Sequence, residues 1–151
     1  MGAAMSNTHG AKGFQNIVVG VADTETSQVA GRKAVELAEA MGATVHFVTA
    51  VTDGEVVVIE VGSDRFVLDT VESSRLAVER FVETLGSSVA YTVQAVEATP
   101  AKALVTVAEL VDADLIVVGN VRMQGLGRVL GSVGNDVAHS APCSVLIVKT
   151  V

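Results

Sequence analysis

Short, continuous apolar runs alternate along this chain with longer segments in which apolar residues recur at helical spacing. Residues 17–21 read Ile-Val-Val-Gly-Val, and residues 115–118 read Leu-Ile-Val-Val. Such runs are typical of strands that are covered on both faces, as in a parallel sheet. The first run is followed by a helical pattern that includes Val29 and Leu37 and ends at Gly42. A strand–helix–strand unit of this length implies a right-handed parallel crossover.

The same alternation continues to the end of the chain. It predicts an α/β fold in which helices cover both faces of a parallel sheet, a three-layer sandwich. We expect one domain over residues 15–151, preceded by a flexible tail over residues 1–14, where Gly, Ala, Ser, Asn and Thr occur without periodicity. The predicted main strands are 17–21, 44–51, 89–96, 114–119 and 144–149, with a helix after each of the first four.

Residues 53–69 interrupt this alternation. Glu55–Val61 and Arg65–Leu68 are β-favouring runs, and Gly62-Ser63-Asp64 between them suits a three-residue hairpin turn. We therefore expect an inserted β-hairpin, after which Thr70 caps the next helix.

The composition limits the classes of function. Half of the 151 residues are hydrophobic, which suits one sizeable core. The formal net charge of −7 argues against a nucleic-acid partner, because such binding needs clustered Lys and Arg. One cysteine and three scattered histidines predict neither an internal disulfide nor a metal site. No apolar run approaches the roughly 20 residues that span a bilayer, so no membrane partner is expected.

The stretch Gly119–Asn135 is glycine-rich and joins a predicted buried strand to a helical pattern that includes Val137. Backbone N–H groups converge at a helix start and favour anions there. Ser132 is a plausible N-cap whose hydroxyl could face such an anion. The stretch matches neither the dinucleotide fingerprint nor the Walker A loop. On local sequence alone, the glycines could equally serve only a tight turn, with Ser132 only capping the helix.

The stretch resembles the nucleotide loop of the universal stress protein family. The family pattern is glycine, two residues, glycine, nine residues, glycine and Ser/Thr. Gly119 matches its first glycine, and Gly131-Ser132 match its last pair. The resemblance extends over residues 98–151 and, less closely, over residues 15–51.

The resemblance implies a five-stranded sheet of order 3-2-1-4-5, as in adenine nucleotide alpha hydrolase-like folds, and a small cytoplasmic stress-response module. It also implies an adenine nucleotide ligand (ATP, AMP or cyclic AMP), with Mg only alongside a bound nucleotide. Catalysis is not expected beyond slow ATP hydrolysis known in the family. The exposed apolar edge of Ser144–Val151 implies a homodimer through the last strand. The expected nucleotide contacts are Val21, Ala22, Ala50, Gly119, Arg122, Gly131, Ser132 and Val133.

Two departures from the family pattern bear on the ligand. Arg122 replaces the second glycine, and the spacing to Gly131 is one residue short. Its guanidinium could bind phosphate, occupy the phosphate space or project into water. Ala22 stands where the family has an aspartate that contacts the nucleoside, and Asp23 follows one residue later. Asp23 could substitute for that aspartate or cap the first helix.

These departures favour keeping a second hypothesis, a dimeric stress-response interaction protein that binds no nucleotide. A third class, an adenylating enzyme or an electron-transfer flavoprotein subunit, is disfavoured because residues 20–24 carry no recognisable phosphate-gripping motif. No nucleophile and general base pair up in the sequence, since Ser132 and His139 lie about two turns apart on one helix.

Overall fold

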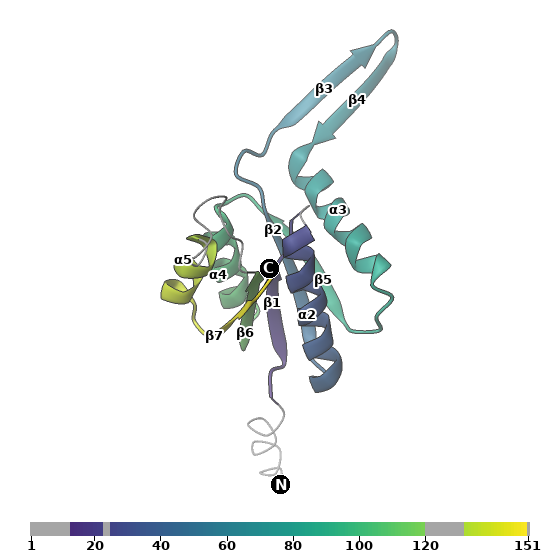
Figure 1. The fold of residues 1–151 in the computed structure, drawn as a ribbon. Coiled ribbons are helices and arrows are strands. Elements are labelled where there is room, and N and C mark those ends of the chain that lie inside the picture. Colours follow the sequence, from purple (N-terminus) through teal and green to yellow (C-terminus); the bar gives the residue numbers. More distant parts are fainter. Residues whose placement is uncertain (1–12, 23–24, 120–131, 151) are drawn as a thin grey trace.

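The central sheet has five parallel strands in the order β5-β2-β1-β6-β7 (Figure 1). The computed structural model describes residues 13–22, 25–119 and 132–150. With the two hairpin strands left out of the count, this is the order 3-2-1-4-5, so the predicted fold class is confirmed. The predicted tail falls mostly outside the described residues and stays a prediction. The strands are β1 (Asn16–Gly20), β2 (Thr44–Ala50), β5 (Tyr91–Val96), β6 (Leu115–Gly119) and β7 (Ser144–Val148).

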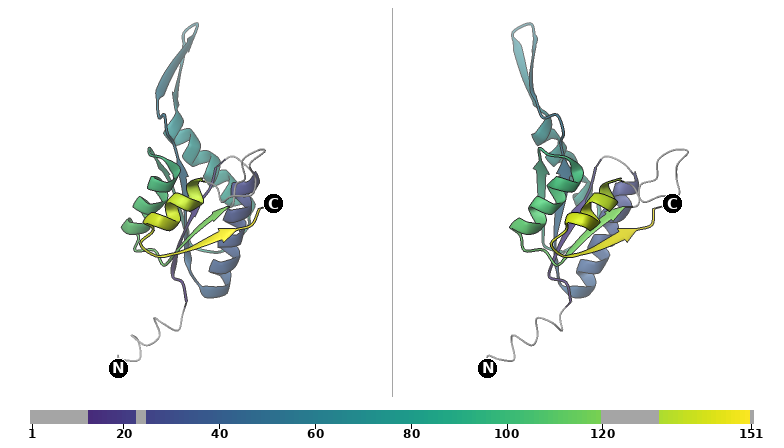
Figure 2. Two further views of the ribbon diagram at one scale, coloured as in Figure 1. Left: turned by 60° about the vertical axis from the view of Figure 1, so that its left-hand side comes forward. Right: turned by 90° about the vertical axis from the view of Figure 1, so that its left-hand side faces the viewer.

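Four helices in the described ranges sandwich this sheet. They are α2 (Glu25–Met41), α3 (Thr70–Thr84), α4 (Pro100–Leu110) and α5 (Ser132–Ser140). Helices α2 and α3 cover one face, and α4 and α5 cover the other (Figure 2). Each face has its own apolar core. None of these helices combines the length and hydropathy needed to cross a membrane.

The inner strands are apolar throughout because both of their faces are covered. Ile17, Val18 and Val19 of β1 are fully buried and alternate between the two cores. On β2, Phe47 is fully buried, and its ring meets that of Tyr91 edge-on at a centroid distance of 6.0 Å. The side chain of Phe14, just before β1, also packs against this core.

The inserted hairpin is present as an arm that projects from the sandwich (Figures 1 and 2). It consists of β3 (Val56–Val61) and β4 (Asp64–Asp69), paired antiparallel from Val56–Asp69 to Val61–Asp64. The turn holds two residues, Gly62 and Ser63, so the predicted three-residue turn is wrong. Gly62 has a φ of +63°, which fits a type II′ turn and lets Asp64 pair in the ladder.

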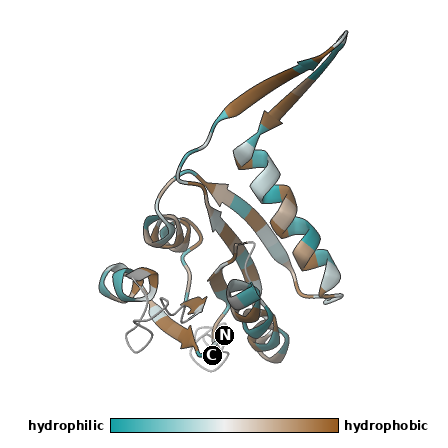
Figure 3. Cartoon of the chain, turned by 45° about the horizontal axis from the view of Figure 1, so that its top comes forward, coloured by the Kyte–Doolittle hydropathy of each residue, from teal (hydrophilic) through white to brown (hydrophobic). Residues whose placement is uncertain are grey.

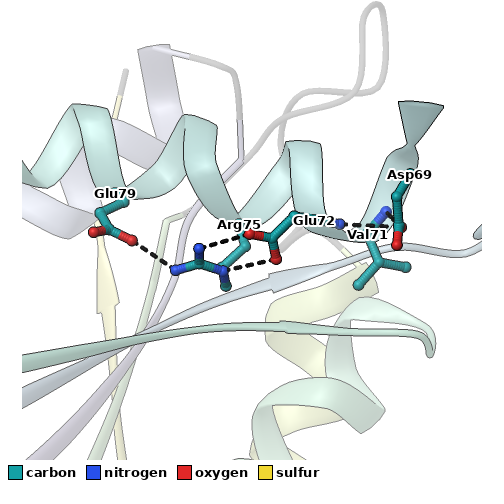
Figure 4. A network of polar contacts seen from close by, with 5 residues as sticks. All are labelled: Asp69, Val71, Glu72, Arg75 and Glu79. Carbon is teal, nitrogen blue, oxygen red and sulfur yellow. Dashed lines mark hydrogen bonds and ion pairs between the residues drawn. The ribbon is translucent and has the colours of Figure 1, made fainter. Parts of the chain in front are cut away.

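Helix α3 is capped by Asp69, so the prediction that Thr70 caps it is wrong. Oδ1 of Asp69 accepts hydrogen bonds from the backbone N–H groups of Val71 and Glu72 at 3.0 and 3.3 Å (Figure 4). Thr70 is the first helical residue, and its hydroxyl instead bonds the backbone of Glu55. A carboxylate also suits the positive end of the helix.

The surface of α3 carries a line of charges beyond this cap. Arg75 bridges Glu72 and Glu79, one turn away on either side, with N···O distances of 2.7 and 2.6 Å (Figure 4). These contacts raise the pKa of Arg75 and lower that of Glu72, each mainly through the side-chain hydrogen bonds. The three side chains thus satisfy one another on the outside of the sandwich.

The start of β1 is held by a residue nearly a hundred positions away. Oδ2 of Asp114 accepts hydrogen bonds from the backbone N–H groups of Gln15 and Asn16 at 2.7 and 2.8 Å.

We expect Asp114→Ala to lower the free energy of unfolding by about 1–3 kcal/mol, because two donors at a partly buried strand start lose their charged acceptor. Urea denaturation measures this change. The matched variant Asp136→Ala, at an exposed site of α5, should change it by less than about 0.5 kcal/mol.

A buried histidine makes stability depend on pH. His46 is 7% exposed, and its Nδ1 and Nε2 lie 2.8 Å from Thr92 Oγ1 and 3.1 Å from Asn16 Oδ1. Burial lowers the pKa of His46, so the folded state favours the neutral ring. As the pH falls below about 6.5, the unfolded chain gains a proton that the folded chain resists. Stability contributed by this residue is therefore complete above about pH 6.5 and decreases below it.

We expect urea denaturation to record this loss between pH 7.5 and 5.5, with a slope of at most about 1.4 kcal/mol per pH unit for one proton. His46→Gln should flatten the slope, whereas His139→Gln, at an exposed site, should leave it unchanged. An unchanged slope in His46→Gln would contradict the assignment.

Candidate functional site

A cavity of about 210 Å³ opens at the carboxyl ends of the central strands, on the side covered by α4. It lies next to the sheet between the ends of β1, β2 and β6 and the first turns of α4 and α5. Its lining residues are Gly20, Val21, Ala22, Ser27, Val48, Ala50, Pro100, Ala103, Leu104, Val118, Gly119 and Val133.

The topology accounts for this position. β1 pairs with both β2 and β6, so the strand order reverses between β1 and β6. The chain leaves β1 into α2 on one face, and it leaves β6 toward α5 on the other. Diverging connections leave a crevice beyond the strand ends, which is where open α/β sheets bind ligands.

Five of the residues predicted to contact a ligand are brought together here. Val21, Ala22, Ala50, Gly119 and Val133, from four separate elements or their ends, all line the cavity. In the sequence, these five residues are spread over more than 100 positions. Their closeness in space is a result of the fold that the sequence alone does not show.

The remaining predicted contacts lie at the edge of what the structure describes. Ser132 is the first residue of α5, so the predicted helix start is present there. Arg122 and Gly131 lie outside the described residues, as does Asp23. The roles assigned to these side chains stay predictions.

Ser27 fixes the turn that follows β1. Its Oγ accepts the backbone N–H of Ala22 at 2.9 Å and donates to the carbonyl of the same residue at 2.8 Å. Ser27 is the third residue of α2, and its side chain folds back onto the end of β1. This contact holds Ala22, an exposed residue, at the rim of the cavity.

The described part of the cavity lining is apolar and carries no charged side chain. Among the described lining residues, no side chain is ionisable, and the hydroxyl of Ser27 is the one polar side-chain group. Such a lining favours a neutral, flat, apolar group such as a heterocyclic ring over an ion. No three His, Cys, Asp or Glu side chains of the described chain gather in a way that could hold a metal ion.

An anion is better placed just outside the cavity, toward α5. The first N–H groups of a helix have no partner within it, and the helix dipole favours negative charge there. Val133, in the first turn of α5, lines the cavity. A molecule with an apolar ring and an anionic tail could therefore use both places.

One wall depends on close packing that sequence periodicity could not reveal. A Cβ added at Gly20 would lie 3.3 Å from two methyl carbons of Leu104, a cavity-lining residue of α4. Glycine thus lets α4 approach the strand end. Leu104 is a buried core residue, and helical periodicity alone does not tell which core positions border a cavity.

The single cysteine lies outside this lining. Burial raises the pKa of Cys143, and the carboxylate of Asp114 raises it further. The raised pKa favours the neutral thiol, which is a poor nucleophile.

Comparisons with known proteins agree on one family. The model of the universal stress protein family matches residues 13–149. A universal stress protein of Methanothermobacter thermautotrophicus (strain Delta H) is 44% identical over 55 residues, which is 36% of this chain and 38% of that protein. The matched part therefore spans well under half the length of this relative.

Solved structures match over most of their length. A universal stress protein in complex with cAMP is 29% identical, with a TM-score of 0.66, and the match covers 91% of this chain and 98% of that one. UspA from Lactobacillus plantarum is 22% identical, with a TM-score of 0.67 and coverages of 89% and 97%. A protein from Archaeoglobus fulgidus in complex with dAMP is 22% identical, with a TM-score of 0.62 and coverages of 89% and 98%.

Proposed function

We propose that this chain, which belongs to the universal stress protein family, binds an adenine nucleotide in the cavity beyond β1 and β6 and acts as a stress-response regulator rather than as an enzyme. The observation that carries the proposal is the convergence of five expected contacts on one apolar cavity beside the start of α5. The relatives solved with cAMP and dAMP support the same ligand class.

The base would occupy the apolar part of the cavity. Ala50 and Val48 come from β2, and Leu104 comes from α4, so an adenine ring could pack between the sheet and this helix. The volume of about 210 Å³ is below the roughly 300–1,000 Å³ of sites that enclose a whole ligand. The cavity therefore suits a base, with the ribose and phosphates extending outward.

The phosphates would lie at the start of α5. Backbone N–H groups there supply the donors, and β6 ends at Gly119 at the same edge of the sheet where α5 begins. We propose that Gly131, Ser132 and Arg122 complete this end of the site. Any Mg would then be held by the phosphates of the bound nucleotide, since the described lining residues supply no carboxylate.

Ala22 sets the expected strength of binding. Where the family has an aspartate, this chain has an exposed alanine whose backbone N–H and carbonyl are both bonded to Ser27. The side chain at position 22 therefore offers a ribose hydroxyl no charged acceptor. We propose that the chain binds its nucleotide more weakly than relatives that carry the aspartate.

Titration calorimetry with ATP, AMP and cyclic AMP tests the proposal. The expected result is a saturable heat for at least one of the three, lost in Gly131→Val, where a branched side chain would fill the phosphate space. Adenosine alone should bind more weakly than its phosphates if the α5 end contributes. Absence of heat with all three at millimolar concentration would contradict nucleotide binding.

The second candidate function is that of a dimeric interaction protein that binds no nucleotide. The observation that favours it is Ala22, which stands where the family has an aspartate that contacts the nucleoside. We propose dimerisation through β7, which forms one edge of the sheet and has no strand of the described residues on its outer side, so that its backbone groups there can pair with a second copy. Light scattering on a variant with Ile147→Lys, in this edge strand, would be expected to show a lower mass than the parent protein.

A further inference from the structure

The arm formed by β3 and β4 exposes large apolar side chains over nearly its whole length. Ile59, Val61, Phe66 and Val67 are 46%, 61%, 56% and 63% exposed, respectively. Figure 3 shows the arm as hydrophobic along both strands, clear of the sandwich. A monomer seldom leaves so many large apolar residues together in water without a binding role.

The arm is also incomplete as a sheet. In the described part of the chain it has two strands, so both outer edges carry backbone groups without a ladder partner. An isolated two-stranded hairpin is marginally stable in water, and further strands stabilise it. Charged residues near the turn, Glu60, Asp64 and Arg65, argue against insertion of the tip into a lipid bilayer.

We propose that the arm pairs with the arm of a second copy of this chain through β4, antiparallel about a two-fold axis at Val67. The product is a four-stranded sheet in the order β3-β4-β4-β3. Its two-fold symmetry uses the same edge of both copies, as closed dimers usually do. The partner's arm points in the opposite direction, so each turn lies beside the base of the other arm.

The sequence of β4 is complementary to itself in this register. With Val67 opposite Val67 of the second copy, Phe66 faces Leu68 and Arg65 faces Asp69, each twice because of the symmetry. Apolar residues meet apolar residues, and each guanidinium meets a carboxylate. Opposite-charge and aromatic–aliphatic cross-strand pairs each stabilise a sheet.

Both Arg65 and Asp69 can form the proposed ion pair between the two copies. Arg65 lies opposite Glu60 in the hairpin, yet no ion pair involving Arg65 forms within the described residues. Asp69 uses Oδ1 for both of its helix-cap bonds. Its second oxygen, Oδ2, can therefore accept from a guanidinium of the second copy without loss of the cap.

Neighbouring registers lack this match. Residues opposite each other in a sheet have their side chains on the same face. A different register of the two β4 strands must therefore place another residue, such as Phe66 or Leu68, on the two-fold axis. With Phe66 on the axis, Arg65 faces Val67 and Asp64 faces Leu68. With Leu68 there, Val67 faces Asp69. Pairing through the outer edge of β3 instead would bring together two strands that contain Glu60 and no basic residue. Charge complementarity therefore favours the β4 edge.

Thiol crosslinking tests the axis directly. In a Cys143→Ser background, Val67→Cys places two thiols across the axis, where opposed Cα atoms lie about 4.5–5.5 Å apart and suit a disulfide. Val58→Cys is the matched control on β3, also exposed. Its two copies would be about 14 Å apart across three strand spacings, too far to bridge. We expect Val67→Cys to dimerise at least about ten times faster, since paired thiols share a high effective concentration.

Charge reversal tests the register. Adding Arg65→Glu to the Val67→Cys chain should slow crosslinking about tenfold, because two attractive pairs become repulsive. Adding Glu60→Gln, on the same face but away from the shared edge, should leave the rate unchanged. Equal rates for Val67→Cys and Val58→Cys, or a Val67→Cys rate indifferent to Arg65→Glu, would overturn the proposal. Neither readout depends on contacts through β7 or on a bound nucleotide.

Discussion

Replacing Ala50 with leucine is expected to weaken binding of adenine nucleotides by about ten- to hundredfold. Ala50 ends β2, is half-buried and lines the cavity, so a larger side chain there would occupy the space proposed for the base. Overpacking a fitted site costs about 1–3 kcal/mol, and each 1.4 kcal/mol is a factor of ten in affinity. Titration calorimetry of the variant and the parent protein with the same nucleotide measures the difference.

The matched control is Ala95→Leu. Ala95 is also half-buried and lies near the end of the neighbouring strand β5, but it does not line the cavity. Its affinity for the nucleotide should stay within about twofold of the parent value, a change of under about 0.5 kcal/mol. Equal losses in both variants would mean that the substitution acts through the sheet rather than through the cavity.

The largest expected effect on stability comes from Phe47→Ala. Phe47 is the largest fully buried side chain and packs between the sheet and the α2–α3 layer, with Tyr91 at its edge. Removing such a ring costs about 3–5 kcal/mol, from lost burial and the cavity left behind. This is a large part of the roughly 5–15 kcal/mol that holds a domain of this kind together. Urea denaturation followed by circular dichroism measures the free energy of unfolding.

The control variant is Phe66→Ala, which removes an exposed phenylalanine ring instead of a buried one. Phe66 is 56% exposed on the arm, so at submicromolar protein concentration its loss should change the unfolding free energy by less than about 0.5 kcal/mol. If Phe47→Ala fails to fold, the milder Phe47→Leu keeps the comparison measurable. Equal effects of Phe47→Ala and Phe66→Ala would contradict the described core.

The sandwich was predictable because its inner strands, β1, β2 and β6, are buried on both faces. Runs such as 17–21 and 115–118 leave no choice of exposed face, and Gly42, which has a positive φ, marks a helix end as expected. Parallel crossovers then limit the topology. The sheet order itself came from family resemblance, since no local pattern determines which strands become neighbours.

Local chemistry at the hairpin was harder to predict. Asp69 and Thr70 both suit a helix cap, and the choice depends on where β4 stops pairing with β3, which is a tertiary property. Similarly, the turn could hold two or three residues until the ladder position of Asp64 was known. The apolar arm was recognised as a hairpin, but its projection away from the sandwich could not be read from alternation alone.

The candidate site was only half predictable for a related reason. Strand ends such as Val21 and Gly119 can be named from sequence because the topology places them at one edge. Pro100, Ala103 and Leu104 come from α4, and their place in the lining depends on how closely this helix approaches Gly20. The folding back of Ser27 onto Ala22 is likewise a contact that spacing alone does not reveal.

A crystal structure of the protein grown with AMP tests the central claim most directly. The account predicts a purine ring between Ala50 and Leu104, with the phosphate beside the first turn of α5. An empty cavity at saturating AMP, or a nucleotide bound elsewhere on the surface, would contradict it.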